Sequence, residues 1–120
     1  MLSAARYGTR DLTRASGFYD ALADLLGAVR VIERDEVIAY QAPDGAMFLI
    51  GLPFAGDASV GNGSQIGFSA PSREVVDAVY ARALALGGAS EGAPGPRGTG
   101  GFYAAYFRDL DGNKLMVAHW

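Results

Sequence analysis

The sequence contains no cysteine and only one histidine among its 120 residues. Disulfide bonds, thiolate catalysis and cysteine-ligated zinc are therefore excluded. Any histidine-dependent acid–base chemistry would depend on His119 alone. Strand alternation turns this residue toward a helix layer or solvent, which favours a structural or inert role over proton transfer.

Long apolar runs and blocks of like charge are also absent. No run approaches the roughly 20 residues of a membrane-spanning helix, and the N-terminal residues lack the layout of a signal peptide. Ten basic and thirteen acidic residues are scattered along the chain, with no basic stripe of the kind that binds nucleic acid. We therefore expect a globular cytoplasmic protein, with neither nucleic acid nor membrane as its partner.

The chain repeats one order of features. Residues 4–28 align without gaps on residues 65–89, and residues 42–53 align on residues 109–120 through a shared Asp-Gly turn. The repeat predicts an α+β fold of tandem βαβββ modules, in which a curved mixed sheet surrounds a cleft and helices cover its outer face. Residues 1–120 then form a single domain, with a first module at 1–53, a linker at 54–63 and a second module at 64–120.

Apolar residues at helical spacing predict one helix in each module. The first begins after Asp11 as N-cap and ends at Gly27, and the second follows Ser72 as N-cap and ends at Gly87-Gly88. Each helix is expected to lay one apolar face on a sheet.

Strands are predicted around the two Asp-Gly turns and after each helix. The expected strands are Val29–Arg34, Glu36–Ala42, Ala46–Leu52, Phe102–Arg108 and Lys114–Trp120. The stretch Ser90–Gly101 holds two prolines and several glycines and is interpreted as a loop with at most a few extended residues. Its part at 92–101 is either a mobile lid or a slack connection.

Five short motifs are spread over nearly the whole chain: Arg10–Leu12, Gly17–Leu22, Ala70–Arg73, Gly92–Arg97 and Tyr106–Lys114. They resemble the vicinal-oxygen-chelate superfamily of glyoxalases, bleomycin resistance proteins and extradiol dioxygenases, and in particular its small glyoxalase-like bacterial proteins. The resemblance implies the fold predicted from the repeat, and a homodimer. It leaves the reaction open, because this superfamily supports isomerisation, ring-opening dioxygenation, thiol addition and drug sequestration.

Metalloenzymes of this superfamily hold their ion with one side chain near the start of the first strand and one on the last strand of each module. The resemblance places these positions at Ala4, Leu49, Gln65 and Met116. One neutral amide among these side chains offers a divalent cation almost no ligands. We therefore expect neither a metal nor another cofactor.

The strand faces that would carry metal ligands are expected to line the cleft. The predicted contacts to a ligand are Arg6, Met47, Leu49, Gln65, Ser69, Tyr103, Met116 and Trp120. This lining suits a small, mostly apolar or aromatic molecule. Alternatively, these residues pack into a closed core.

The polar candidates each have two interpretations. Arg6 in an apolar cleft would bind a ligand carboxylate or phosphate, unless it pairs with a nearby acid or faces solvent. The phenol of Tyr103 would bond a ligand or pack in an aromatic core. Asp109 and Asp111 could form a carboxylate dyad, but their sequence Asp-Leu-Asp-Gly-Asn favours turn residues.

No catalytic residue is assigned from the sequence. The favoured function is a glyoxalase-like protein with a degenerate metal site that binds a small organic molecule without metal. The alternative is a metal-dependent enzyme, lactoylglutathione-lyase-like or dioxygenase-like, with ligands misplaced here or shared across a homodimer. A structural or regulatory dimer without a ligand is the third possibility.

Overall fold

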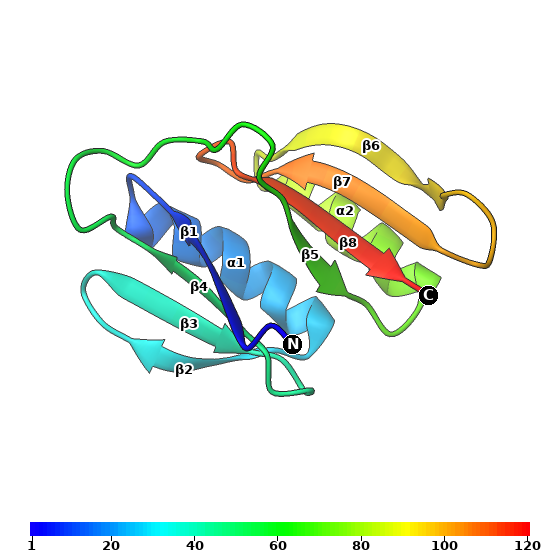
Figure 1. Cartoon of the computed structure of the whole chain (residues 1–120), viewed down its shortest axis with the longest axis horizontal. Coiled ribbons are helices and arrows are strands. Elements are labelled where there is room, and N and C mark those ends of the chain that lie inside the picture. The colour runs from blue at the N-terminus through cyan, green and yellow to red at the C-terminus, as the bar shows by residue number, and fades with distance from the viewer.

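The computed structural model describes all 120 residues and shows two consecutive βαβββ modules (Figure 1). The first module comprises β1 (Ala4–Gly8), α1 (Leu12–Leu26), β2 (Val29–Glu33), β3 (Val37–Gln41) and β4 (Met47–Gly51). The second comprises β5 (Ile66–Ser69), α2 (Arg73–Ala85), β6 (Ala89–Pro96), β7 (Tyr103–Arg108) and β8 (Lys114–His119). The α+β class and the tandem modules are therefore as predicted.

The strands form two four-stranded sheets of identical topology. Their orders are β1-β4-β3-β2 and β5-β8-β7-β6, and in each the first strand runs parallel to the last while the other pairs are antiparallel. Both helices lie on the same side of the two sheets, behind them in the view of Figure 1. We call the opposite side, where the strands face away from the helices, the open face.

The helix boundaries follow from local capping. The Asp11 side chain accepts a hydrogen bond from the backbone N–H of Arg14, and Ser72 accepts one from Val75 in the same way. At the C-terminus of α1, Gly27 adopts φ 73°, a left-handed conformation that glycine takes without steric strain. Neither helix is long and apolar enough to cross a membrane.

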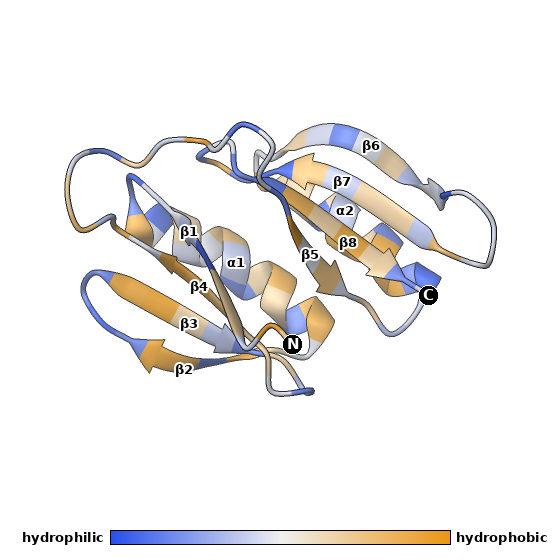
Figure 2. Cartoon of the chain, viewed as in Figure 1, coloured by the Kyte–Doolittle hydropathy of each residue, from blue (hydrophilic) through white to orange (hydrophobic).

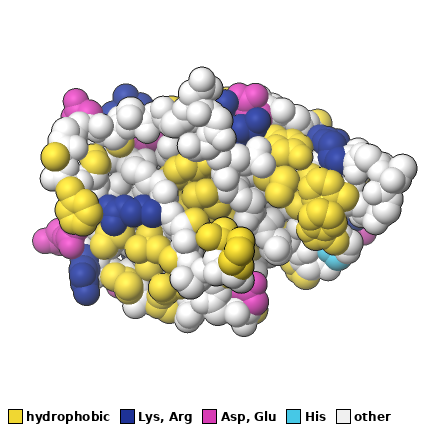
Figure 3. All heavy atoms as spheres, in the orientation of Figure 1, with side chains coloured by type: hydrophobic (Ala, Val, Ile, Leu, Met, Phe, Trp, Pro, Cys, Tyr) yellow, Lys and Arg dark blue, Asp and Glu magenta, His cyan; other side chains and the backbone are white.

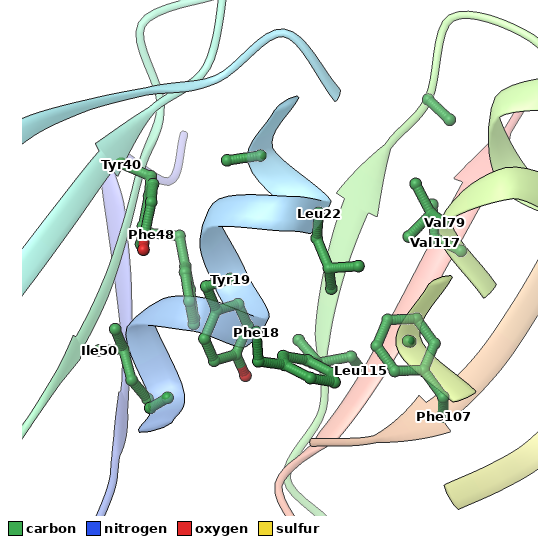
Figure 4. Packing of buried hydrophobic residues seen from close by; sticks show 14 of the residues in the cluster. Phe18, Tyr19, Leu22, Tyr40, Phe48, Ile50, Val79, Phe107, Leu115 and Val117 are labelled. Carbon is green, nitrogen blue, oxygen red and sulfur yellow. The ribbon is translucent and has the colours of Figure 1, made fainter. Parts of the chain in front are cut away.

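A single hydrophobic core of 17 buried residues runs through both modules (Figure 4). Phe48 of β4 and Phe68 of β5 bring their ring centroids to 5.2 Å, and Phe18 of α1 lies 6.4 Å from Phe107 of β7. Strand β4, with the sequence Met-Phe-Leu-Ile-Gly, is apolar along most of its length, as the hydropathy colours of Figure 2 show. Burying a side chain such as Phe18, only 2% exposed, contributes about 1.5–3 kcal/mol.

The interpretation of Ser90–Gly101 as a loop is wrong for its first half, because Ala89–Pro96 forms β6. This strand pairs with β7 through two register shifts, between Ser90 and Gly92 and between Gly92 and Gly95. It is also the edge strand of its sheet. A sheet tolerates proline at edge positions and at bulges, because no hydrogen bond between strands there requires the N–H that proline lacks.

The Asp-Leu-Asp-Gly-Asn turn between β7 and β8 is buried against the first module. Asp109 Oδ1 accepts hydrogen bonds of 2.9 Å from the backbone N–H groups of Asp111 and Asn113, as expected of a turn residue. Asp111 Oδ2 accepts from the Thr9 hydroxyl at 2.5 Å, and Asn113 Nδ2 donates to the Gly8 carbonyl at 3.0 Å. Both carboxylates are therefore fixed by structural hydrogen bonds, and that of Asp111 joins the two modules.

Candidate functional site

The main cavity lies where the edge strand β1 of the first module approaches the edge strand β5 of the second. It has a volume of about 540 Å³. Helix α1 forms its floor with the buried side chains of Tyr19, Leu22 and Ala23. Its walls come from β1, β4 and β5, including Phe48 and Phe68. The cavity is thus mostly apolar and is built from both modules.

Most polar groups at this cavity are already satisfied. The Tyr19 hydroxyl donates to Asp109 Oδ2 at 2.5 Å, and the Tyr40 hydroxyl donates to Asp20 Oδ1 at 2.6 Å. Burial, followed by the neighbouring carboxylate, raises the pKa of each phenol. Neither tyrosine is therefore suited to act as a base at neutral pH.

Three of the predicted contacts line this cavity. Met47, Gln65 and Ser69 lie at its wall together with Ala4. The Gln65 amide makes only a long contact of 3.9 Å to Met116 Sδ. Asp44 also lines the cavity, and its Oδ1 accepts a 3.0 Å hydrogen bond from the Ala46 N–H. Gln65 and the exposed Ser69 are the neutral polar side chains left to orient a bound molecule.

Four further predicted contacts lie on the open face, outside the cavity wall. Arg6 donates from Nη2 to the Leu52 carbonyl at 2.7 Å, and its guanidinium carbon is 5.8 Å from the Phe54 ring centroid. The residue is exposed and forms no ion pair with an acid. The remaining three are Leu49, Met116 and Trp120, and the Trp120 ring stacks on Phe102 with centroids 4.2 Å apart.

Tyr103, the eighth predicted contact, lies away from the cavity. Its hydroxyl donates a 2.6 Å hydrogen bond to Asp77 Oδ1 on α2, and the residue pairs with His119 on the helix side of the sheet. This hydrogen bond raises the pKa of the phenol. The neighbouring aromatic residues Phe102 and Tyr106 take the open face instead, because strand alternation separates them from Tyr103 by one and three positions.

The family-type metal positions do not fit a metal ion. No group of three or more His, Cys, Asp or Glu side chains is placed to hold one. The four positions Ala4, Leu49, Gln65 and Met116 supply only an amide and a thioether, a poor set for a divalent ion that prefers imidazole or carboxylate. His119 lies on the helix side, with Nδ1 2.9 Å from the Ala70 carbonyl oxygen.

Some lining residues were not identified from the sequence. Leu22, Ala23 and Leu26 line the cavity from α1, although their helical spacing indicated only core packing. A second, polar cavity of about 430 Å³ is lined by residues 60–65, Arg108 and Lys114. Arg108 and Lys114, the two cations that flank the Asp-Gly turn, were the sequence feature that could have indicated this second cavity. Residues 92–101 do not line the main cavity.

Comparisons with known proteins agree with this architecture. A family model described as the Glyoxalase/Bleomycin resistance protein/Dioxygenase superfamily matches residues 2–117. A crystal structure of a glyoxalase/bleomycin resistance protein from Albidiferax ferrireducens T118 is 38% identical, covers 100% of this chain and 98% of that one, and has a TM-score of 0.92. No curated protein matches the chain.

Two more distant structures share the fold alone. A lactoylglutathione lyase from Agrobacterium tumefaciens is 23% identical, with 99% of this chain and 92% of that one covered and a TM-score of 0.70. The fosfomycin resistance protein FosX from Listeria monocytogenes is 22% identical, with 100% and 93% covered and a TM-score of 0.72.

Proposed function

The chain belongs to the glyoxalase/bleomycin resistance protein/dioxygenase superfamily, and on that premise we propose that it binds a small organic molecule without a metal ion. The observation that carries the proposal is the cavity of about 540 Å³ between the modules. Its volume falls within the roughly 300–1,000 Å³ of small-molecule sites. Its apolar walls and its two available polar side chains, Gln65 and Ser69, favour a mostly apolar or aromatic ligand held by one or two hydrogen bonds.

A metal-dependent lyase or dioxygenase is disfavoured by the donor set. Such an enzyme needs an ion with open positions for substrate oxygens, and therefore several protein ligands to retain that ion. Elemental analysis of protein purified without chelators should find far less than one metal ion per chain. Stoichiometric nickel, zinc, manganese or iron would contradict the proposal.

A neutral fluorescent probe tests the cavity directly. N-phenyl-1-naphthylamine fluoresces when it enters an apolar site, and we expect it to bind with a stoichiometry of one per cavity. Ser69→Trp should weaken binding by about tenfold or more, because the indole fills space that the probe needs. Ser59→Trp is the matched control, since Ser59 is exposed and does not line the cavity. Equal binding by the two variants would reject this site.

The homodimer expected from the family resemblance is also proposed here. Light scattering coupled to gel filtration should give twice the 12.5 kDa of one chain. A mass of one chain over a range of concentrations would contradict it.

A further inference from the structure

A second cavity adjoins the first and differs from it in chemistry. It has a volume of about 430 Å³ and is formed by residues 60–65, by Arg108 at the end of β7 and by Lys114 at the start of β8. Gln65 lines both cavities. The two cavities therefore meet at the Gln65 residue.

The second cavity is electropositive in a chain whose net charge is −3. Its lining residues include two cations and no acid. Lys114, the only lysine of the chain, takes part in none of the five ion pairs. Its ammonium lies 5.7 Å from the Tyr106 ring centroid and forms no ion pair, although its charge, after that of Arg108, helps to lower the pKa of Glu91.

Arg108 supplies the second charge, and one acid compensates it. Its Nε donates to Glu91 Oε1 at 2.9 Å, and its Nη1 donates to the Gly112 carbonyl at 3.1 Å. Glu91 lies outside the cavity lining. The pair Arg108–Glu91 is neutral together, so the uncompensated charge at the cavity is that of Lys114. One positive charge matches a singly charged anion better than a doubly charged one.

Neutral hydrogen-bond donors complete the second cavity. The Asn62 amide and the Ser64 hydroxyl both belong to its lining, and their side chains make no hydrogen bond within the protein. The turn that carries them is tight, because the Ser64 N–H donates to the Gly61 carbonyl at 3.2 Å. A Cβ atom at Gly61 would clash with Ser64 Oγ, so glycine suits this close approach.

We infer that the second cavity is an anion-binding subsite and that the ligand is an organic molecule with an apolar body and one singly charged oxyanion, such as a carboxylate. The inference rests on the proposed function, because the apolar body occupies the main cavity. The oxyanion is bound by Lys114, with Asn62 and Ser64 as additional donors. Figure 3 shows the open face, on which basic side chains lie beside apolar patches.

Two probes with the same apolar body separate this inference from the proposed function. They are 1-anilinonaphthalene-8-sulfonate, which is singly charged, and N-phenyl-1-naphthylamine, which is neutral. We expect the sulfonate to bind more tightly than the neutral probe at low salt, and this difference to shrink as sodium chloride is added. Failure of the neutral probe to bind rejects the main cavity, whereas equal affinities of the two probes reject only the anion subsite.

Variants assign the charge effect to one residue. Lys114→Gln should weaken binding of the sulfonate roughly fivefold and leave the neutral probe unchanged, and Lys114→Arg should retain the preference. Arg34→Gln is the control, because it removes the same charge from an exposed residue that forms no ion pair. If Arg34→Gln and Lys114→Gln weaken sulfonate binding equally, the effect is one of net charge and the inference fails.

Chemical labelling gives a readout that does not depend on affinity. Since Lys114 is the only lysine, an amine-reactive acetylating reagent can modify only this side chain and the N-terminal amine. The sulfonate should slow acetylation of Lys114 and leave the N-terminus unaffected, as measured by mass spectrometry. Undiminished acetylation at saturating sulfonate would overturn the inference.

Discussion

The hydroxyl group of Tyr19 donates a 2.5 Å hydrogen bond to Asp109 Oδ2, and this bond joins α1 of the first module to the β7–β8 turn of the second. Tyr19 is 2% exposed and also forms part of the cavity floor. The same Asp109 oxygen accepts from Asn113 Nδ2 at 2.9 Å. One buried carboxylate therefore holds its own turn and also fixes the helix at the floor of the main cavity.

Removal of this hydroxyl should destabilise the protein. Tyr19→Phe leaves a buried carboxylate short of one donor, and we expect a loss of about 1–3 kcal/mol in the free energy of unfolding. Tyr80→Phe is the matched control, because the Tyr80 hydroxyl donates to Ser90 Oγ at an exposed site. That variant should lose less than about 0.5 kcal/mol. Urea unfolding followed by circular dichroism compares the two.

The same tyrosine predicts a loss of stability at alkaline pH. Burial and Asp109 raise the pKa of Tyr19 in the folded state well above its usual value of 10.0. Below pH 10 both states keep the proton; above it the unfolded state releases a proton that the folded state retains, so stability falls as pH rises. The stability deficit of Tyr19→Phe should therefore narrow above pH 10, and a constant deficit up to the alkaline limit of folding would contradict this assignment.

Asp20 predicts a complementary dependence at acidic pH. Its carboxylate accepts hydrogen bonds from Arg30 at 2.8 and 2.6 Å and from the Tyr40 hydroxyl at 2.6 Å. The Arg30 hydrogen bonds, with that of Tyr40, lower the pKa of Asp20 below its usual value of 3.8. The stabilisation is present above this value and is lost as pH falls below it. Asp20→Asn should cost about 1 kcal/mol at pH 7, since the group is partly exposed, and less at pH 3; urea unfolding at the two pH values measures both.

Two glycines of the first module should respond to alanine in opposite directions. Gly17 lies inside α1, and a methyl group at this position would meet no neighbour within 4 Å, so Gly17→Ala should stabilise the protein by about 0.5–1 kcal/mol. Gly27 has φ 73°, and Gly27→Ala should destabilise it by roughly 1 kcal/mol. Thermal denaturation shows whether each variant is more or less stable than the original protein. A higher stability of Gly27→Ala would contradict the left-handed conformation of the cap.

The cavity floor should be sensitive to loss of volume. Leu22 is 1% exposed and faces both the core and the cavity, so Leu22→Ala should cost about 2–5 kcal/mol. Leu25→Ala, on the same helix, is the control, because Leu25 is 37% exposed. Guanidinium unfolding distinguishes them, and comparable losses would mean that the register of α1 is wrong.

The fold followed from the sequence because its signals are local. Asp11, Ser72 and Gly27 cap helices through bonds and torsions within a few residues, and strand alternation turned Met47 and Ser69 toward the wall of the cavity. The interpretation failed at β6, where prolines and glycines concealed an irregular edge strand. Tyr103 was assigned to the cleft because both faces of β7 carry aromatic residues, so alternation alone could not choose between them.

The site was only partly predictable because it depends on how the modules meet. Met47, Gln65 and Ser69 were identified from strand faces, but the α1 residues at the floor satisfy the pattern of an ordinary core helix. The second cavity brings the linker beside Arg108 and Lys114, which are distant from it in sequence. A periodic pattern within one segment of the sequence does not indicate contacts between residues so far apart in the chain.

Because the hydrophobic core is continuous, the two modules of this protein form one folding unit. Because Phe48 packs on Phe68 and Phe18 lies near Phe107, severing the chain between β4 and β5 would give two fragments, each with an uncovered aromatic surface. Neither fragment is expected to fold by itself, whereas a mixture of the two should reassemble into the native arrangement. The two modules are thus mutually dependent, and the main cavity exists only where they meet.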